Sequence, residues 1–140
     1  MPYDHPLTVR YADTDAQGHV FFANLLTYFD EGLTGYLTAI GCDYAGLHDR
    51  DGVDFVYAES MCRYRDRTRF GDDVRVRVQV VHLGRTSMKS RVQALRGETV
   101  LAEGHLVSVC VDAETLEKAP LPARFRQAVE AFEGTLGAIP

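Results

Sequence analysis

Apolar and polar side chains alternate at the start of the chain, where Leu7, Val9 and Tyr11 fall on one side of an extended segment. An alternation with a period of two is typical of a strand with one buried face. We therefore expect a half-buried strand from Leu7 to Tyr11. Residues 12–18 are rich in turn formers and interrupt this pattern.

The period changes to that of a helix after the turn, because apolar residues recur at the i, i+3, i+4 and i+7 spacing from residue 22 to residue 40. The positions that form this stripe are Phe22, Leu25, Leu26, Phe29, Leu33, Tyr36, Leu37 and Ile40. Gly32 and Gly35 lie inside the expected helix, although each costs roughly 0.8–1 kcal/mol relative to alanine. We expect a close approach of the helix to a sheet as their compensation, and Gly41 is placed to end the helix.

Beyond about residue 54 the chain has the alternation of β-structure, interrupted by short turns. The expected strands span Phe55–Tyr64, Val74–Val80, Ser87–Leu95 and Thr99–Val111. Long neighbouring strands joined by short turns indicate an antiparallel meander. After the prolines at 120 and 122, a short helix is expected over Ala123–Phe132, with Phe125, Val129 and Phe132 facing inward.

This order of elements, one strand, a long helix and then four strands, predicts an α+β fold. A long helix with a wide apolar stripe can hide that stripe against one antiparallel sheet only if the sheet curls around it. We therefore expect a five-stranded antiparallel sheet curled around one long central helix, followed by a short C-terminal helix. The length of 140 residues favours a single domain over residues 1–140.

Composition and charge narrow the functions that fit this chain. Hydrophobic residues make up 46% and charged residues 25%, the balance of a folded globular protein. The formal net charge of -5 argues against a nucleic-acid partner. No stretch approaches the roughly 20 apolar residues of a membrane-spanning helix, and the N-terminus shows no secretory signal. We expect a cytoplasmic protein without a membrane partner.

The sequence contains three widely spaced cysteines, Cys42, Cys62 and Cys110, and no C-x-x-C pair. An odd number at this spacing argues against a disulfide framework or a zinc ribbon, so free and mostly buried thiols are expected. The five histidines show no metal-type clustering. Neither a metal nor another cofactor is therefore expected.

The segment between the first strand and the helix carries the most informative chemistry. It reads Tyr11-Ala-Asp13-Thr-Asp15-Ala-Gln-Gly18-His19-Val20, followed by Asn24 and by Tyr28-Phe29-Asp30. A carboxylate on the loop before a helix can lie beside the free N–H groups at the helix start. Cleavage of a thioester needs such a pair, namely a nucleophile or base and a donor that stabilises the oxyanion.

These residues resemble the signature of the 4-hydroxybenzoyl-CoA thioesterase family, a group of acyl-CoA thioesterases with the hot-dog fold. That signature reads aromatic-x-D-x-D-x-x-G-x-V, followed after a short gap by Asn and by an aromatic-aromatic-acid step. The resemblance continues through Tyr64, Phe70-Gly71-Asp72-Asp73-Val74, Leu83-Gly84-Arg85-Thr86-Ser87 and Pro120-Leu121-Pro122. It therefore extends over nearly the whole chain.

The resemblance implies hydrolysis of an acyl-CoA thioester to a free acid and coenzyme A, with Asp15 as the catalytic aspartate at the N-terminus of the central helix. The backbone N–H of Phe22 is the candidate donor that polarises the thioester carbonyl. Asp15 either attacks directly to give an anhydride or activates water, and the sequence leaves both routes open. Asp13 is interpreted as a loop organiser, because aspartates in turns usually bond to nearby backbone.

Two phenylalanines depart from the family pattern. Several relatives have a histidine at the position of Phe22, and others have consecutive asparagines at Phe21 and Phe22. The backbone N–H of residue 22 is still able to polarise the carbonyl after this change of side chain. The two apolar side chains are expected to wall an acyl pocket. His19 either lines the site and tunes Asp15 or is a loop histidine half in solvent. Asn24 is expected to position Asp15 or a water molecule, with a plain cap at the helix start as the alternative.

Arg85, Ser87 and Lys89 resemble the hairpin that contacts the phosphates or the pantetheine of coenzyme A in these proteins. Arginine and a hydroxyl suit phosphate oxygens, although a solvated strand face explains the same residues. The arginines at 63, 65, 67 and 69 follow a period of two and are expected on one face of a strand. We interpret them as a solvent face balanced by acids rather than as a nucleotide-binding rim.

The resemblance also implies a homodimer, often doubled to a homotetramer, in which two sheets meet edge to edge and both chains build each site. A curled sheet by itself indicates only that an edge strand has unpaired backbone groups, which another chain or element has to cover. Two other functions stay open. A hydratase or dehydratase of the same fold is disfavoured, because no H-x-x-x-x-P-G-type motif precedes the helix. A non-catalytic acyl-CoA or acyl-carrier-protein binding module would not need Asp15.

Overall fold

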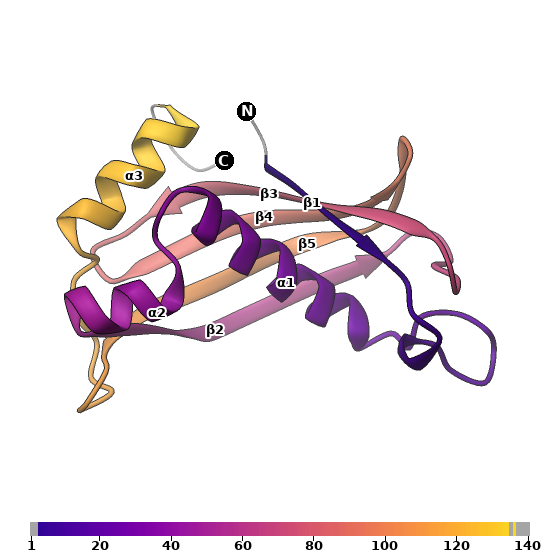
Figure 1. Ribbon diagram of the computed structural model, residues 1–140, viewed down its shortest axis with the longest axis horizontal. Helices are drawn as coiled ribbons and strands as arrows, with labels where there is room; N and C mark the ends of the chain where they lie inside the picture. The colour runs from indigo at the N-terminus through magenta and orange to yellow at the C-terminus, as the bar shows by residue number, and fades with distance from the viewer. Residues whose placement is uncertain (1–2, 135, 137–140) are drawn as a thin grey trace.

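A computed structural model describes residues 3–134 and 136, which form a five-stranded antiparallel sheet with helices (Figure 1). The strands are β1 (Tyr3–Thr8), β2 (Val53–Tyr64), β3 (Asp73–Leu83), β4 (Ser87–Arg96) and β5 (Thr99–Asp112). The helices are α1 (Asn24–Ala39), α2 (Tyr44–Gly46) and α3 (Ala123–Glu133), with two short helical turns, η1 (Tyr11–Asp13) and η2 (Leu47–Asp51). The spatial strand order is β1, β3, β4, β5, β2, so β1 and β2 are the two edges. The expected α+β class and five-stranded antiparallel sheet are confirmed.

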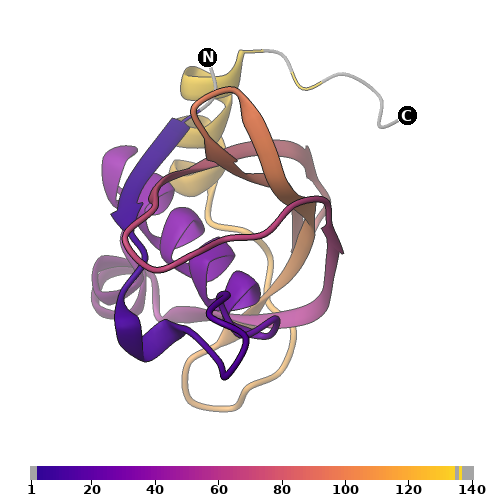
Figure 2. The same ribbon diagram turned by 90° about the vertical axis from the view of Figure 1, so that its right-hand side faces the viewer.

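Helix α1 packs against one face of the sheet, and Figure 2 shows the strands curving around it. Phe29, Leu33 and Leu37 of this helix are fully buried. Each such side chain stabilises the fold by about 1.5–3 kcal/mol relative to an exposed position. Gly32 permits the contact, since a Cβ at that position would collide with the side chain of Val76 on β3. The close approach expected at Gly32 is therefore confirmed.

Strand β3 shows how the alternation in the sequence sorts the two faces of the sheet. The positions buried toward α1 are Val74, Val76, Val78 and Val80. Arg75 and Arg77 lie on the opposite side, which we call the outer face. Both arginines pair there with Asp4 of β1 at 2.8 Å. The outer face is therefore polar, as expected for a sheet covered by helices on one side only.

The first strand differs from the expectation. β1 spans Tyr3–Thr8, whereas the alternation predicted a strand over Leu7–Tyr11. The chain turns early because the Asp13 side chain accepts a hydrogen bond from the backbone N–H of Arg10 at 3.1 Å and starts η1. Tyr11 is consequently 78% exposed instead of facing the core.

Helix α1 begins two residues after the expected start at Phe22. The backbone N–H of Phe21 donates to the carbonyl of Asp13 at 2.9 Å, which ties this segment to the preceding loop. At the other end, Gly41 follows the helix with a φ of +78°, a left-handed conformation that suits glycine. No helix in the described part of the chain is long and apolar enough to span a bilayer.

The arginine run after residue 62 does not follow one strand. β2 ends at Tyr64, so only Arg63 of the four arginines belongs to it. The backbone N–H groups of Arg65 and Asp66 both donate to the carbonyl of Leu101, at 2.8 and 3.1 Å, and turn the chain out of the strand. The prediction that all four arginines share one strand face is wrong, because this tertiary contact ends the strand first.

Candidate functional site

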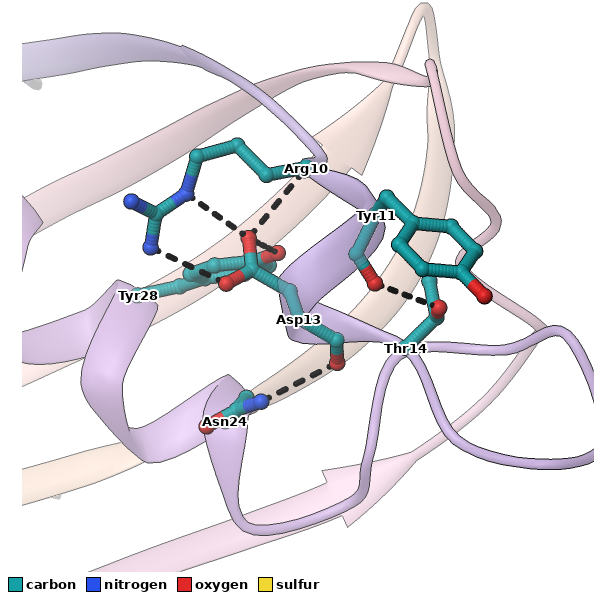
Figure 3. Close-up of polar contacts among 6 residues, drawn as sticks. All are labelled: Arg10, Tyr11, Asp13, Thr14, Asn24 and Tyr28. Atoms are coloured by element: carbon teal, nitrogen blue, oxygen red, sulfur yellow. Dashed lines mark hydrogen bonds and ion pairs between the residues drawn. The ribbon is translucent and has the colours of Figure 1, made fainter.

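The loop before α1 is organised around Asp13, whose side chain is buried (Figure 3). One carboxylate oxygen accepts hydrogen bonds from the Tyr28 hydroxyl at 2.8 Å and from the Arg10 backbone N–H at 3.1 Å. The other oxygen accepts from the Arg10 guanidinium at 3.0 Å. Burial alone would raise the pKa of Asp13, but these bonds outweigh it and hold that pKa below its ordinary value. Asp13 is thus the expected loop organiser.

The backbone carbonyl of Asp13 ties this loop to α1. It accepts hydrogen bonds from the Phe21 N–H at 2.9 Å and from the side-chain amide of Asn24 at 3.0 Å (Figure 3). The Asn24 donor is therefore directed at Asp13 and not at Asp15. Any effect of Asn24 on Asp15 is transmitted through the loop.

Asp15 occupies a tight turn two residues further along. Its backbone N–H donates to the His19 carbonyl at 2.8 Å, and its carbonyl accepts from the Gly18 N–H at 3.0 Å. Gly18 has a φ of +80°, which requires the left-handed conformation that glycine adopts most easily. Asp15 Oδ1 accepts one hydrogen bond, from the Gln17 N–H at 2.8 Å. Within the described residues no hydrogen bond reaches Oδ2, so this oxygen is available to a ligand.

Phe22 lies just before α1, and its backbone N–H has no hydrogen-bond acceptor among residues 3–134 and 136. Its carbonyl accepts from the Leu25 N–H at 3.3 Å and from the Tyr64 hydroxyl at 2.9 Å. The rings of Phe22 and Tyr64 also meet edge to face with centroids 6.4 Å apart. Phe22 is thus held by α1 and by the end of β2, while its N–H stays free to donate.

Asp15 and Phe22 line the same hollow of about 510 Å³, which we call the N-terminal cleft. Its lining residues are Asp15, Gln17, His19, Val20, Phe22, Leu25, Tyr64, Arg65, Asp66, Arg67, Thr68 and Leu101. The positive end of the α1 dipole favours negative charge that develops here. The cleft therefore combines a carboxylate, the start of a helix and a lining of mixed apolar and polar side chains, an arrangement that could bind and attack a thioester carbonyl.

The two phenylalanines contribute differently to this cleft. Phe21 does not line it; its ring is 44% exposed and packs on Phe22 with centroids 4.9 Å apart. Phe22 lines the cleft but is 62% exposed, so it forms an open side of the wall. The expectation that both rings wall one pocket stays a prediction. His19 does line the cleft, and in the described chain its ring makes no hydrogen bond to Asp15.

The hairpin residues expected to contact coenzyme A lie toward the other end of the sheet. Ser87 begins β4 and is paired with Val109 of β5, whereas Leu101, eight residues earlier on β5, bounds the N-terminal cleft. At the usual rise of a strand this separation is about 27 Å. Arg85 is exposed in the turn before β4, and Lys89 lines a different hollow. A single chain does not bring these three residues to the N-terminal cleft.

Sequence reasoning did not identify Tyr64, Arg65 and Leu101 as parts of the cleft. Tyr64 contacts a residue 42 positions earlier in the chain, and periodicity along one element carries no information about such a partner. The only available signal was that Tyr64 belongs to a stretch with a family-like sequence.

The described residues hold no cluster of metal-type ligands, and the pKa values of their cysteine thiols are raised. No group of three or more His, Cys, Asp or Glu side chains in residues 3–134 and 136 is arranged to hold a metal ion. Burial raises the pKa of Cys110 to about 11 and also raises the pKa of Cys42 and Cys62. None of these thiols is therefore poised as a thiolate nucleophile near neutral pH.

Comparison with known proteins assigns the chain to a family. The sequence pattern of the Thioesterase-like superfamily matches residues 9–129. The 1,4-dihydroxy-2-naphthoyl-CoA hydrolase of Synechococcus sp. (strain CC9605) is 31% identical over 120 residues, which cover 82% of this chain and 80% of that protein. The acyl-CoA thioester hydrolase YbgC of Escherichia coli O6:H1 is 27% identical over 127 residues, 87% of this chain and 94% of the relative.

Solved structures agree with this assignment. The gentisyl-coenzyme A thioesterase BH1999 superposes with a TM-score of 0.83 at 27% sequence identity, covering 91% of this chain and 99% of that chain. The similarity thus extends over most of this chain. From the match over residues 9–129 and the shared hot-dog fold, we conclude that this chain belongs to the Thioesterase-like superfamily.

Proposed function

We propose that this chain hydrolyses an acyl-CoA thioester to a free acid and coenzyme A, with Asp15 as the catalytic carboxylate. The observation that carries the proposal is the N-terminal cleft, which both Asp15 and Phe22 line at the start of α1. Family membership supports this class of reaction, and the two curated relatives are hydrolases of CoA thioesters. In this proposal residues 1–140 form one hot-dog domain with α1 as its central helix.

The thioester carbonyl oxygen lies against the N–H of Phe22, and its carbonyl carbon faces the Oδ2 atom of Asp15. The N–H and the dipole of α1 stabilise the negative charge on this oxygen as the carbon becomes tetrahedral. The hydrogen bond from the Gln17 N–H to Asp15 Oδ1, at 2.8 Å, keeps the carboxylate oriented. A fixed carboxylate beside a fixed donor lowers the cost of reaching the transition state.

Asp15 acts in one of two ways. As a nucleophile, its oxygen bonds to the carbonyl carbon, the C–S bond breaks, and coenzyme A leaves as a thiolate that takes a proton from solvent. Water then cleaves the resulting mixed anhydride and regenerates the carboxylate. As a base, Asp15 takes a proton from water while the water oxygen attacks, and that proton finally neutralises the departing thiolate.

Other side chains around the cleft have supporting roles. The ring of Phe22, backed by the ring of Phe21, contacts the acyl group. His19 lines the cleft near Asp15 and adds a titratable charge to its surroundings. Asn24 acts indirectly, because it holds the loop that carries Asp15 through a 3.0 Å hydrogen bond to a backbone carbonyl.

The proposal includes a second copy of the chain. β2 is an edge strand whose residues 56–60 are exposed, with Val56 at 47% and Tyr57 at 44%. An apolar edge strand of this kind is a template for pairing. Antiparallel pairing of two β2 edges joins the sheets in a homodimer, which can double into a homotetramer. It also brings Arg85 and Lys89 of one chain to the end of the assembly that holds the N-terminal cleft of the other.

A panel of short, medium, long and aromatic acyl-CoAs, assayed for free thiol and for free acid, tests the proposal. We expect thiol and acid in equal amounts, with aromatic acyl groups preferred because the rings of Phe22 and Tyr64 line the cleft. Hydration of an enoyl-CoA without release of thiol would instead indicate a hydratase. Binding of every acyl-CoA without turnover would indicate a non-catalytic binding module, and either result would contradict the proposal.

A further inference from the structure

Leu116 lies in the tight turn between β5 and α3, and its backbone φ is +62°. No other residue except glycine has a positive φ within residues 3–134 and 136. A residue with a Cβ adopts this left-handed conformation at a cost in free energy, and such costs are found mainly where function requires them. The side chain of Leu116 is also 65% exposed. An apolar residue that is both strained and exposed needs an explanation beyond the turn itself.

The turn is built by Asp112, the last residue of β5, and not by the leucine side chain. Asp112 Oδ1 accepts hydrogen bonds from the backbone N–H groups of Glu114 and Thr115, both at 2.9 Å. The Asp112 carbonyl accepts from the Leu116 N–H, also at 2.9 Å. Glycine or asparagine would fit the left-handed position with less strain. The local structure therefore does not account for a leucine here.

Two other uncovered apolar side chains lie at the N-terminal cleft. Phe22 and Tyr64 line this cleft and are 62% and 50% exposed. Their rings contact each other, with centroids 6.4 Å apart, but leave one side of the cleft open. Aromatic rings stabilise an interface strongly when a partner covers them. The open side of the cleft therefore has the chemistry to receive an apolar side chain.

Within one chain the strained turn and the N-terminal cleft lie at opposite ends of β2 (Figure 1). The turn adjoins the start of this strand, because the Ala113 N–H donates to the Gly52 carbonyl at 2.9 Å. Tyr64, at the cleft, is the last residue of the strand. The 12 residues of β2 separate the two ends by about 36 Å at the usual rise. Leu116 therefore does not cover the cleft of its own chain.

Antiparallel pairing of two β2 edges brings these ends together. The exposed segment of β2, residues 56–60, is centred on residue 58. A two-fold axis at this point places the partner's Tyr64 beside Gly52, and the turn with Leu116 lies one strand further out. Two strand spacings correspond to about 10 Å, a distance that a leucine and a tyrosine side chain span together. Two-fold symmetry repeats the contact at the other end of the interface.

We propose that Leu116 covers the open side of the partner subunit's N-terminal cleft, where it packs on the partner's Phe22 and the partner's Tyr64. The contact removes these apolar side chains from water, which offsets the strain of the turn. It also keeps water from the acyl group and limits which acyl groups fit. This inference rests on the dimer of the proposed function, and it adds to each site a residue that determines specificity from the second chain.

Chemical cross-linking tests the contact without any need for turnover. In the double variant Leu116→Cys/Arg65→Cys, a short bismaleimide that spans about 10 Å is expected to join two chains, because Arg65 directly follows β2 at the cleft. The two introduced thiols of one chain are too far apart for this reagent. The matched control, Leu116→Cys/Gln79→Cys, carries its second thiol on β3, away from the β2 edge. It is expected to give only the background that Leu116→Cys alone gives.

Hydrolysis assays then test whether the leucine affects the substrate. Leu116→Asn keeps the turn, since asparagine tolerates a positive φ, but it replaces the apolar contact by a polar group. Its kcat/KM is expected to fall by about three- to tenfold, to a different extent for different acyl groups. Leu116→Met keeps an apolar side chain of similar volume and is expected to stay within about twofold of the wild type. Melting temperatures verify that both variants are folded.

Mixed dimers show on which chain the leucine acts. Chains with Asp15→Asn and chains with Leu116→Asn are unfolded together in equal amounts and refolded. In each mixed dimer the cleft that retains Asp15 is covered by the partner's Leu116, so the activity of the mixture is expected to reach at least about a quarter of the wild-type value. A leucine that acted on its own chain would leave the mixture with about half the activity of Leu116→Asn.

The inference would be overturned by cross-linking no stronger than in the Gln79→Cys control, by the mass of a single chain on light scattering, or by a mixture without this gain in activity. Full activity of Leu116→Asn on every acyl group would likewise exclude a role in specificity. A wild type that releases no thiol from any acyl-CoA, while the cysteine variant forms the cross-link, would refute the proposed function and leave the contact confirmed. The two failures are therefore distinguishable.

Discussion

Asp13 and Asp15 are two residues apart on one loop, yet their surroundings are opposite. Asp13 is 7% exposed, and both of its carboxylate oxygens accept hydrogen bonds from Arg10 or Tyr28. Asp15 is only half-buried, accepts a single bond from a backbone N–H at 2.8 Å, and lines the N-terminal cleft. The same side chain is therefore fully bonded at one position and open to a ligand at the other.

The difference shows what separates a carboxylate that holds a fold from one that can do chemistry. Inside the loop, the charge of Asp13 is stabilised by donors that also fix its position. Its two oxygens can therefore accept few further hydrogen bonds from a ligand. Asp15 is fixed through Oδ1, while its second oxygen accepts no hydrogen bond from the described residues and the residue lines a cleft at the positive end of α1. The loop needs both, because the bonds of Asp13 determine where Asp15 lies.

Replacing Asp15 by asparagine tests whether its carboxylate takes part in the reaction, and this change should have the largest effect. Asp15→Asn keeps the shape but removes the nucleophile or base, so kcat should fall by at least about 10²-fold. The melting temperature should stay close to that of the wild type. Asp66→Asn, which removes another carboxylate from the same cleft, is the matched control. A well-folded Asp15→Asn variant within a few-fold of wild-type activity would exclude Asp15 as the catalytic residue.

The reverse pattern is expected when Asp13 is replaced by asparagine. One acceptor oxygen becomes an N–H₂ donor and faces the donors of Arg10 or Tyr28, so the free energy of unfolding should fall by about 1–3 kcal/mol. Chemical denaturation measures this change, and kcat of the folded fraction should fall far less than in Asp15→Asn. Tyr28→Phe, which removes one of these donors, should destabilise less. Equal loss of kcat in both aspartate variants would remove the distinction between them.

The pH dependence of stability sharpens the same contrast. The pKa of Asp13 is lower in the folded protein than its ordinary value of 3.8, so its charged form stabilises the fold. This contribution is present above the unfolded-state pKa and is lost as the pH falls through the lowered folded-state pKa. The stability difference between wild type and Asp13→Asn should therefore be constant near neutral pH and shrink below about pH 4. A difference that grows on acidification would contradict this sign.

A smaller effect is expected for Tyr64→Phe. This change tests how the proposed donor, the backbone N–H of Phe22, is held in place, and it leaves the carboxylate of Asp15 untouched. This change keeps the ring against Phe22 but removes the hydroxyl that donates to the Phe22 carbonyl at 2.9 Å. A hydrogen bond worth about 0.5–1.5 kcal/mol corresponds to a loss of roughly two- to tenfold in kcat, with KM little changed. Tyr11→Phe, at a residue that is 78% exposed and does not line the cleft, is the control. A rise in KM with unchanged kcat would place Tyr64 in substrate binding alone.

The least change in the best attainable rate is expected for Phe22→Ala. The backbone N–H of Phe22 is retained in this variant, while the ring that lines the cleft is lost. The ranking of acyl groups in the acyl-CoA panel should therefore change more than the highest kcat. A uniform loss for every acyl group would mean that the side chain holds the helix start instead of contacting the substrate.

Local patterns in the sequence were sufficient for most of the elements. The alternation of valines predicted β3, and the spacing of apolar residues predicted α1 to within two residues at its start. The first strand was misplaced, because the bond from the Arg10 N–H to Asp13 turns the chain before Tyr11. This bond uses a backbone N–H group that could otherwise pair in the sheet. The alternation of side chains along the chain gives no sign of such a bond.

An acidic loop before an amphipathic helix, and a polar-faced sheet after it, could be predicted from the sequence, since both depend on residues close together in the chain. The same local patterns placed Asp15, His19 and Phe22 in one region. The contact of Tyr64 with Phe22, and the position of Ser87 at the start of β4 far from the cleft, became visible in the folded chain alone. The physical reason is that side-chain periodicity reports which face of an element is buried, whereas distant contacts depend on how strands pair and where each strand ends.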